Sequence, residues 1–257
     1  MNFLTAVHTD IGIKKNTNQD SMLLMQATTS VGEVIFAVVC DGMGGLKKGE
    51  LASAEVVRAM AGWFREEFPE MLQSGFDPAA LKSAWKRITE EQDDRISRFG
   101  AGNGMRLGTT MVGFLGIGNQ YYIVNIGDSR VYQISDRQLL QLTHDHTVVQ
   151  REVDLGRMTL EEAEQDNRRS ILLQCIGASD YVEPDFFTGT MQPDQMYLLC
   201  CDGFRHVLSA NEFCQHMGPR VLRDEKSMSQ TLLQLTEEIK RRREADNISA
   251  ILIRTCR

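Results

Sequence analysis

Val38-Val39-Cys40-Asp41-Gly42 and Leu199-Cys200-Cys201-Asp202-Gly203 repeat one pattern, an apolar run that ends in Asp-Gly. Short apolar runs of this kind predict buried β-strands. The strand fixes the backbone of the aspartate that ends it, and the glycine after it lets another group approach the main chain closely. The sequence therefore predicts two strand ends that each present a carboxylate.

Two further carboxylates lie at strand ends. Asp128 follows the run Asn125-Ile126-Gly127, and Asp246-Asn247 opens the last apolar run of the chain. A single Asp-Gly pair most often marks a turn, so none of these residues identifies a site alone. Together they favour an oxygen-rich cluster, which selects Mg²⁺, Mn²⁺ or Ca²⁺ rather than zinc. The glycines between Asp41 and Gly45 predict a turn into a helix, without the Lys-Ser/Thr of a P-loop.

The rest of the sequence predicts strands that follow one another along the chain and helices that follow one another. Expected strands cover residues 23–27, 33–40, 109–117, 120–126, 131–134, 139–142, 196–201 and 248–253. Expected helices cover 50–68 and 77–99, begin at the capping boxes Thr159…Glu162 and Ser209…Glu212, and carry an apolar stripe of Met228, Leu232, Leu235 and Ile239. Strands grouped with strands indicate an α+β fold with sheets covered by helices. Because no linker, repeat or low-complexity tract interrupts the chain, we expect residues 1–257 to form a single domain.

Composition excludes several classes of protein. The chain has 257 residues, with 28 Lys and Arg against 35 Asp and Glu, giving a net charge of −7. The acidic balance argues against a nucleic-acid-binding module, and no apolar run reaches the length of a membrane span. Six scattered cysteines do not form a disulfide framework. We expect a cytoplasmic protein that is not associated with a membrane.

With these motifs in this order, the chain resembles the metal-dependent protein phosphatase family (PPM, the protein phosphatase 2C type), and its bacterial branch in particular. The stretches that carry the resemblance are Thr9–Gly12 with Asn18–Ser21, Asp41–Gly45, Gly108–Thr110, Gly127–Tyr132, Leu142–His146, Cys201–Gly203 and Asp246-Asn247. They are collinear from residue 9 to residue 247. The resemblance implies a four-layer αββα sandwich of two antiparallel sheets flanked by helices, with a flap at about 144–170 near the active site.

The resemblance also implies an activity, the hydrolysis of phosphoserine and phosphothreonine in proteins by a metal-activated water that attacks phosphorus directly. Two Mn²⁺ or Mg²⁺ ions are implied, with a third, weaker ion in bacterial members. Asp41 would bridge the two metals, and the carbonyl of Gly42 would bind one of them. Asp202 and Asp246 would bind the other, and Asp20 would act through metal-bound water. Asp128 would hold the third ion together with Asp202.

One departure from the family pattern concerns phosphate binding. Lys15 stands where the family usually has a phosphate-binding arginine, so a point charge replaces a planar fork. A non-catalytic module that binds phosphoproteins therefore stays open as an alternative. A phosphohydrolase of small molecules also stays open, because the motifs encode the metal site but not the substrate groove. The expected partners are phosphorylated proteins and an opposing Ser/Thr kinase, with no nucleic acid, and we expect a monomer. Cys40 and Cys201 precede proposed ligands, and we expect both to be buried, inert thiols rather than redox-sensitive ones.

Overall fold

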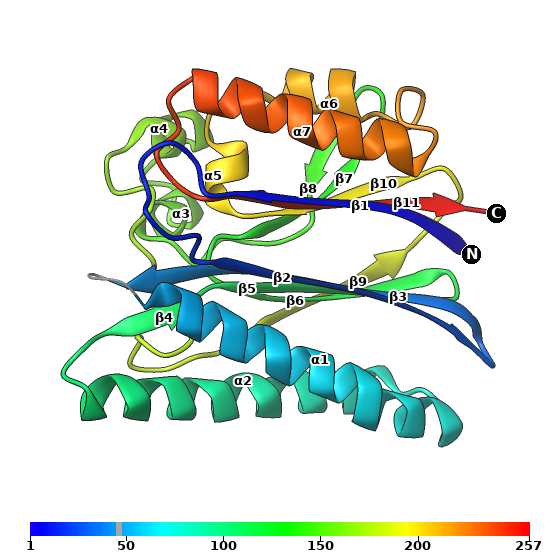
Figure 1. The fold of residues 1–257 in the computed structure, drawn as a ribbon, viewed down its shortest axis with the longest axis horizontal. Helices are drawn as coiled ribbons and strands as arrows, with labels where there is room; N and C mark the ends of the chain where they lie inside the picture. The colour runs from blue at the N-terminus through cyan, green and yellow to red at the C-terminus, as the bar shows by residue number, and fades with distance from the viewer. Residues whose placement is uncertain (45–47) are drawn as a thin grey trace.

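The protein folds into four layers, two of helices and two of β-sheet (Figure 1). The computed structural model describes residues 1–44 and 48–257. The strands are β1 (Asn2–Asp10), β2 (Asp20–Thr29), β3 (Gly32–Gly44), β4 (Leu107–Thr109), β5 (Met111–Ile117), β6 (Gln120–Ile126), β7 (Arg130–Ile134), β8 (Leu139–Gln141), β9 (Asp185–Thr190), β10 (Met196–Cys200) and β11 (Ile248–Cys256). The helices are α1 (Gly49–Gln73), α2 (Pro78–Gly102), α3 (Val148–Asp154), α4 (Leu160–Gln165), α5 (Asp202–Arg205), α6 (Ala210–Met217) and α7 (Glu225–Arg241).

Two antiparallel sheets form the inner layers. One sheet has the strand order β1-β11-β10-β7-β8, and the other has the order β2-β3-β5-β6-β9, with β4 paired to β3. Helices α1 and α2 cover the outer face of the second sheet, and α6 and α7 cover the first (Figure 1). The arrangement confirms the predicted α+β fold of four αββα layers.

The side chains of β3 point alternately to the two faces of its sheet and show how the sequence builds these layers. Ile35, Ala37 and Val39 point between the two sheets, whereas Phe36 and Val38 pack toward α1 and α2. All of them are fully buried, because both faces of the strand are covered. The continuous apolar run before Asp41 is therefore the signature of a central strand.

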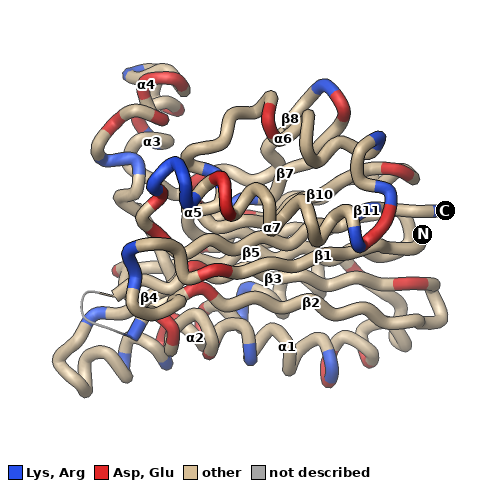
Figure 2. The backbone as a smooth tube through the Cα atoms, turned by 45° about the horizontal axis from the view of Figure 1, so that its top comes forward, with Lys and Arg blue, Asp and Glu red and all other residues tan. Residues whose placement is uncertain are grey.

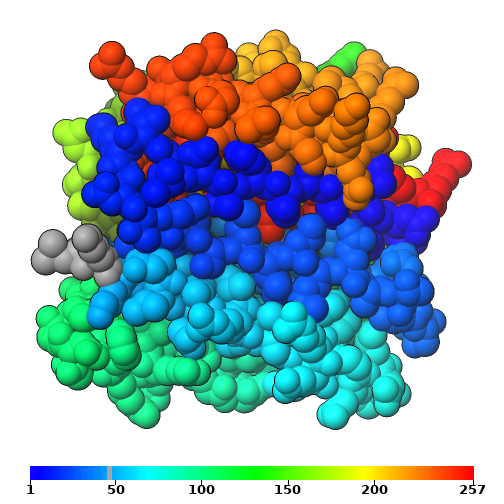
Figure 3. All heavy atoms as spheres, viewed as in Figure 1, coloured from blue at the N-terminus to red at the C-terminus, as the bar shows by residue number. Residues whose placement is uncertain are grey.

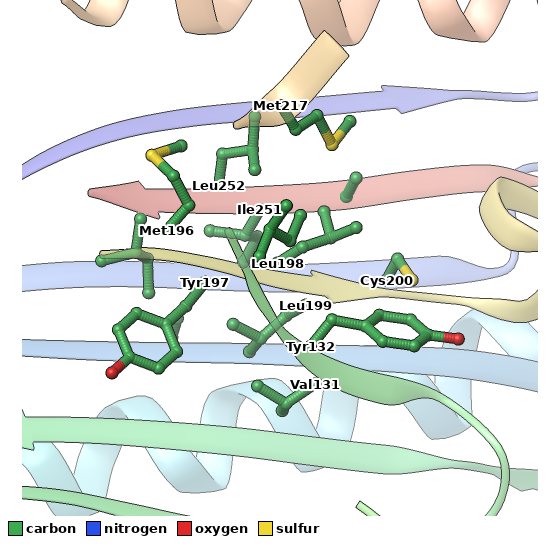
Figure 4. Packing of buried hydrophobic residues seen from close by; sticks show 14 of the residues in the cluster. Val131, Tyr132, Met196, Tyr197, Leu198, Leu199, Cys200, Met217, Ile251 and Leu252 are labelled. Atoms are coloured by element: carbon green, nitrogen blue, oxygen red, sulfur yellow. The ribbon is translucent and has the colours of Figure 1, made fainter. Parts of the chain in front are cut away.

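The core between the sheets is filled mainly by the strands of the first sheet. Figure 4 shows Tyr197, Leu199 and Val131 on the side that faces the second sheet. The buried ring of Tyr197 packs against Phe114 of β5, with centroids 5.1 Å apart. This packing joins the two sheets, so their strand ends keep fixed relative positions.

Most predicted elements are present, with shifted ends. The helices expected at 50–68 and 77–99 run further, and both capping boxes form. One prediction is wrong: the glycines after Asp41 do not turn directly toward a helix. Strand β3 continues to Gly44, because Gly42 pairs with Thr109 of β4. Gly45, the end of that predicted turn, lies outside the described residues.

The structure adds β1, β9, α3 and α5 to the predicted elements. In β1 only Phe3 and Ala6 are buried, so the strand lacks a clear alternation of apolar and polar residues. Figure 3 shows this N-terminal segment crossing one face of the molecule between α7 and β2. Helices α3 and α5 have 7 and 4 residues, too short for a periodic stripe. Among the described helices, none is long and apolar enough to span a membrane.

Candidate metal centre

Strand pairing brings Asp20 and Asp41 together. Asp20 begins β2, Asp41 lies near the end of β3, and the two are direct partners in the antiparallel register. Side chains of directly paired residues project from the same face of a sheet. The pairing therefore places two carboxylates side by side without any loop contribution.

Asp202 and Asp246 reach the same end of the molecule from the other sheet. Asp202 begins α5 directly after β10, and Asp246 lies just before β11, the neighbour of β10. Figure 2 shows acidic segments from separate parts of the chain around the ends of β3 and α5. The negative charges of Asp202 and Asp246 raise the pKa values of Asp20 and Asp41, so the four carboxyl groups interact electrostatically.

Hydrogen bonds with Thr109 and Thr110 hold the backbone of Asp41 in place. The hydroxyl of Thr110 accepts a hydrogen bond from the Asp41 amide at 3.0 Å, and the Thr110 amide donates to the Asp41 carbonyl at 2.9 Å. The Thr109 hydroxyl donates to the same carbonyl at 2.9 Å. The Gly-Thr-Thr stretch is thus the support that orients Asp41.

Two glycines allow the ligand-bearing segments to approach one another. A Cβ at Gly42 would lie 2.3 Å from the carbonyl oxygen of Gly49 and 2.4 Å from that of Gln19. A Cβ at Gly203 would lie 2.2 Å from the carbonyl oxygen of Asn247. Any side chain at these positions would push apart the segments that carry the aspartates.

Asn247 ties the N-terminal loop to the site. Its side-chain oxygen accepts from the Gln19 amide at 2.9 Å, and its amide group donates to the carbonyls of Ile11 and Thr17 at 2.9 and 3.2 Å. The loop that leads into Asp20 is therefore anchored to the residue next to Asp246. The sequence marks Asn247 only as part of a motif and does not predict this bridging role.

Burial and mutual repulsion raise the pKa values of these carboxyl groups. Desolvation, with the charges of Asp202 and Asp246, raises the pKa of Asp20 to about 7, although Ser249 and Cys201 nearby oppose the shift. The pKa of Asp41 lies well above its usual value, again from desolvation first and then from Asp20 and the other aspartates. Without a cation, the site is costly to ionise.

The donor set fits divalent cations. Among the described residues, neither carboxylate oxygen of Asp20 has a hydrogen-bond partner, and the same holds for Oδ1 of Asp202. Ligand atoms of Asp20, Asp41 and Cys201 all lie within 4.8 Å of one another. Buried, unpartnered carboxylate oxygens carry a large cost that a hard cation removes.

Cys201 lies closer to the carboxylates than the sequence suggests. Its Sγ donates to the carbonyl of Asn247 at 3.4 Å and accepts from the amide of Ser249 at 3.2 Å. Desolvation and the neighbouring aspartates raise the pKa of Cys201 well above its usual value, and Cys40 behaves in the same way. Both cysteines are buried, as expected, and both are held in the thiol form that reacts poorly.

Lys15 reaches the carboxylates. Its Nζ lies 2.8 Å from Oδ1 of Asp246, and both side chains are more than a third exposed. Partial burial opposes the charge of Lys15, but the hydrogen bond to Asp246 and the charges of Asp41 and Asp202 raise its pKa. The ammonium group therefore lies on the solvent side of the acidic cluster, where an incoming anion meets it.

Asp128 lies beside this group but has a partner of its own. Its buried carboxylate pairs with Arg205, with 3.3 Å between Oδ2 and the guanidinium. Desolvation, with the charge of Asp202, still raises the pKa of Asp128 to about 7 against the opposing effect of Arg205. The sequence does not predict Arg205, although it lies only three residues after Asp202.

The flap borders the site on the side of α5. It contains α3 and α4, and a cavity of about 290 Å³ separates it from α5 and α6. Arg169, Arg205 and His206 line this cavity. A second hollow, of about 440 Å³, adjoins Met43 and Gly44 at the end of β3. The two hollows thus adjoin β3 and α5, the elements that carry Asp41 and Asp202, although the described residues that line them do not include these aspartates.

Comparisons with known proteins agree with this geometry. The family model described as "Protein phosphatase 2C" matches residues 13–246. A "Putative protein phosphatase 2C-type" of Streptococcus pyogenes is 30% identical over 224 residues, which cover 86% of this chain and 87% of that protein. The serine/threonine phosphatase stp of Listeria monocytogenes is 28% identical over 250 residues, or 95% of this chain and 93% of that protein.

Solved structures share the fold as well. The serine/threonine phosphatase Stp1 of Staphylococcus aureus superposes with a TM-score of 0.84 and 26% identity, covering 99% of this chain and 95% of that one. The catalytic domain of PstP in complex with two manganese ions superposes with a TM-score of 0.78 and 28% identity, covering 99% of each chain. The matched residues extend over almost the whole sequence and include the carboxylates of the candidate centre, so the chain belongs to the protein phosphatase 2C family.

Proposed function

We propose that this protein hydrolyses phosphoserine and phosphothreonine in other proteins and needs Mn²⁺ or Mg²⁺ to do so. The observation that carries the proposal is the convergence of Asp20, Asp41, Asp202 and Asp246, in which both oxygens of Asp20 and Oδ1 of Asp202 are buried and have no hydrogen-bond partner among the described residues. The names of the matched relatives and the manganese ions of the PstP structure support it.

The chain's own residues would hold two cations. Asp41, whose carboxyl group feels the charges of Asp20, Asp202 and Asp246, would hold the cations together with the carbonyl of Gly42, Asp202 and Asp246. Asp20 faces Asp41 and would orient the water around the ions. When bound, the cations supply a water of lowered pKa as the nucleophile and neutralise the phosphoryl oxygens.

Lys15 would receive the phosphate. Its ammonium group contacts Asp246 from the solvent side, so a phosphoryl group that enters the cluster passes within its reach. Cation binding by Asp246 would free the ammonium for the substrate. A lysine supplies one point charge without the two parallel hydrogen bonds of an arginine, so we expect weaker binding rather than loss of turnover.

We propose that a protein substrate binds in the hollows near the cluster. The hollow beside Met43 in β3 and the cavity beside Arg205 in α5 would give room for a peptide near the elements that carry Asp41 and Asp202. We propose residues 1–257 as one catalytic domain, monomeric and cytoplasmic, that opposes a Ser/Thr kinase. The non-catalytic alternative is not favoured, because the carboxylates are all present and the relatives are named as phosphatases.

Phosphate release from a phosphothreonine peptide tests the proposal. Wild-type protein with Mn²⁺ should release phosphate, Asp202→Asn should be nearly inactive, and Asp94→Asn, an exposed control on α2, should match the wild type. Parallel assays with p-nitrophenyl phosphate measure the preference for peptides. A lack of peptide hydrolysis with any divalent cation would refute the proposal, and activity confined to small phosphoesters would favour the small-molecule alternative.

A further inference from the structure

We infer that Arg205 supplies the positive charge at Asp128 that the family resemblance would assign to a third metal ion, so that this chain binds two ions rather than three. The inference rests on the metal centre proposed above and concerns its outer edge. It follows from the contacts of Asp128, which differ from those of Asp20 and Asp202.

Arg205 holds both the side chain and the main chain of Asp128. One guanidinium nitrogen lies 3.3 Å from Oδ2 of Asp128 and donates to its carbonyl oxygen at 3.1 Å. The two side chains are 11% and 5% exposed, so solvent screens this pair little. In contrast, Asp20 has no hydrogen-bond partner for either carboxylate oxygen among the described residues.

The pair belongs to a larger buried network that is close to neutral. Arg205 also lies 3.7 Å from Oδ2 of Asp145, and Arg130 binds Asp145 through Nε and a terminal nitrogen at 2.9 and 2.6 Å. Arg130 donates its remaining terminal nitrogen to the hydroxyl of Tyr132 at 2.7 Å. Two arginines and two aspartates thus alternate, and their formal charges cancel; Asp202 lies outside these contacts, and its charge still raises the pKa of Asp128.

The local structure fixes Arg205 in this role. Asp202 and Arg205 are three residues apart in α5, so they lie on neighbouring positions of one helical turn. Asp202 acts on Asp20 and Asp41, while Arg205 reaches Asp128. A helix this short keeps both side chains near the centre.

The turn that carries Asp128 is also held firmly. The Gly127 amide donates to Nδ1 of His146 at 3.2 Å, and the Gly127 carbonyl accepts from the His146 amide at 2.9 Å. On the other side, Nε2 of His146 lies 3.0 Å from Oδ2 of Asp185 in β9. These contacts keep Asp128 against Arg205, so binding a cation there would require separating the pair.

Electrostatic repulsion decides whether a metal ion can bind Asp128 next to the guanidinium of Arg205. A divalent ion on Asp128 would lie next to the guanidinium in a region of low dielectric, where like charges repel strongly. The guanidinium is permanently charged and covalently attached, so it stays beside Asp128 at every cation concentration. The neutral network therefore excludes the third ion.

The number of bound Mn²⁺ ions tests the inference, measured on the full chain by calorimetry and by equilibrium dialysis with elemental analysis. We expect two ions in the wild type and two in Asp128→Asn. Arg205→Met should bind a third, weaker ion, because Asp128 then loses its cation. Arg254→Met removes an arginine that is equally buried, at the opposite end of β11 from Asp246, and should keep two.

Each result separates this inference from the proposed function. Three ions in the wild type, with one lost in Asp128→Asn, would overturn the role of Arg205 but leave the phosphatase proposal intact. A folded Arg205→Met that binds only two ions would also overturn it. If that variant does not fold, the comparison of the wild type with Asp128→Asn still decides. Absence of any Mn²⁺ from the wild type would overturn the metal centre itself.

Discussion

Replacing Asp20 with asparagine should stabilise the metal-free protein and weaken its response to metal. Desolvation and the charges of Asp202 and Asp246 raise the pKa of Asp20 from 3.8 to about 7. An acid whose pKa is higher in the folded state takes up protons on folding, so its contribution to stability falls as pH rises through this window. At pH 8 the ionised carboxylate opposes folding, and at pH 4 it does not.

The size of the effect follows from the shift. A rise of about three pKa units corresponds to about 4 kcal/mol, an upper value because neighbouring carboxylates share the repulsion. In a domain of this length, 1 kcal/mol moves Tm by about 2–4 °C, so Asp20→Asn should raise the Tm of metal-free protein by up to about 15 °C at pH 8. At pH 4 the two proteins should unfold at nearly the same temperature.

Thermal unfolding followed by circular dichroism measures this difference. Chelator-treated wild type, Asp20→Asn and the exposed control Asp94→Asn are compared from pH 4 to pH 8, with and without Mn²⁺. Mn²⁺ should raise the Tm of the wild type most at high pH and raise that of Asp20→Asn less. Equal Tm values for metal-free wild type and Asp20→Asn at pH 8, or a difference between the two that does not grow from pH 4 to pH 8, would refute the reasoning.

Three further substitutions test how the site is held and what it binds. Lys15→Arg should lower KM for a phosphopeptide several-fold in steady-state assays, because the guanidinium offers two hydrogen bonds, and an unchanged KM would count against Lys15 as the phosphate ligand. Gly203→Ala should weaken Mn²⁺ binding measured by calorimetry, since its Cβ would lie 2.2 Å from the carbonyl of Asn247; wild-type affinity would contradict this. Asn247→Ala should lower the free energy of unfolding in urea by about 3 kcal/mol, because the Gln19, Ile11 and Thr17 backbone groups lose their partner. A loss below about 1 kcal/mol would show that the loop is held by other contacts.

The strand-end aspartates are the part of the site that the residues themselves predict. Asp41 and Asp202 follow apolar runs that only buried strands explain, and the structure places both where those strands end. Asp246 opens the last predicted strand, which is a weaker local signal, whereas Asp20 has none and its role came from the ordered family motifs. Their convergence depends on the pairing of β2 with β3 and on the packing of the two sheets, which no local pattern encodes.

The network around Asp128 lies beyond sequence patterns for the same reason. Arg205 and Asp145 come from distant segments, and only the tertiary fold brings them within 3.7 Å. The extension of β3 through Gly42 is another case, because it depends on pairing with Thr109. Periodicity predicts elements, whereas contacts between elements decide which charges are compensated and which are left for a metal.

An anomalous difference map from crystals soaked in Mn²⁺ tests the central claim most directly. We predict two strong peaks among Asp20, Asp41, Gly42, Asp202 and Asp246, and no peak at Asp128. The absence of any peak among these residues, at a Mn²⁺ concentration that supports turnover, would contradict the account.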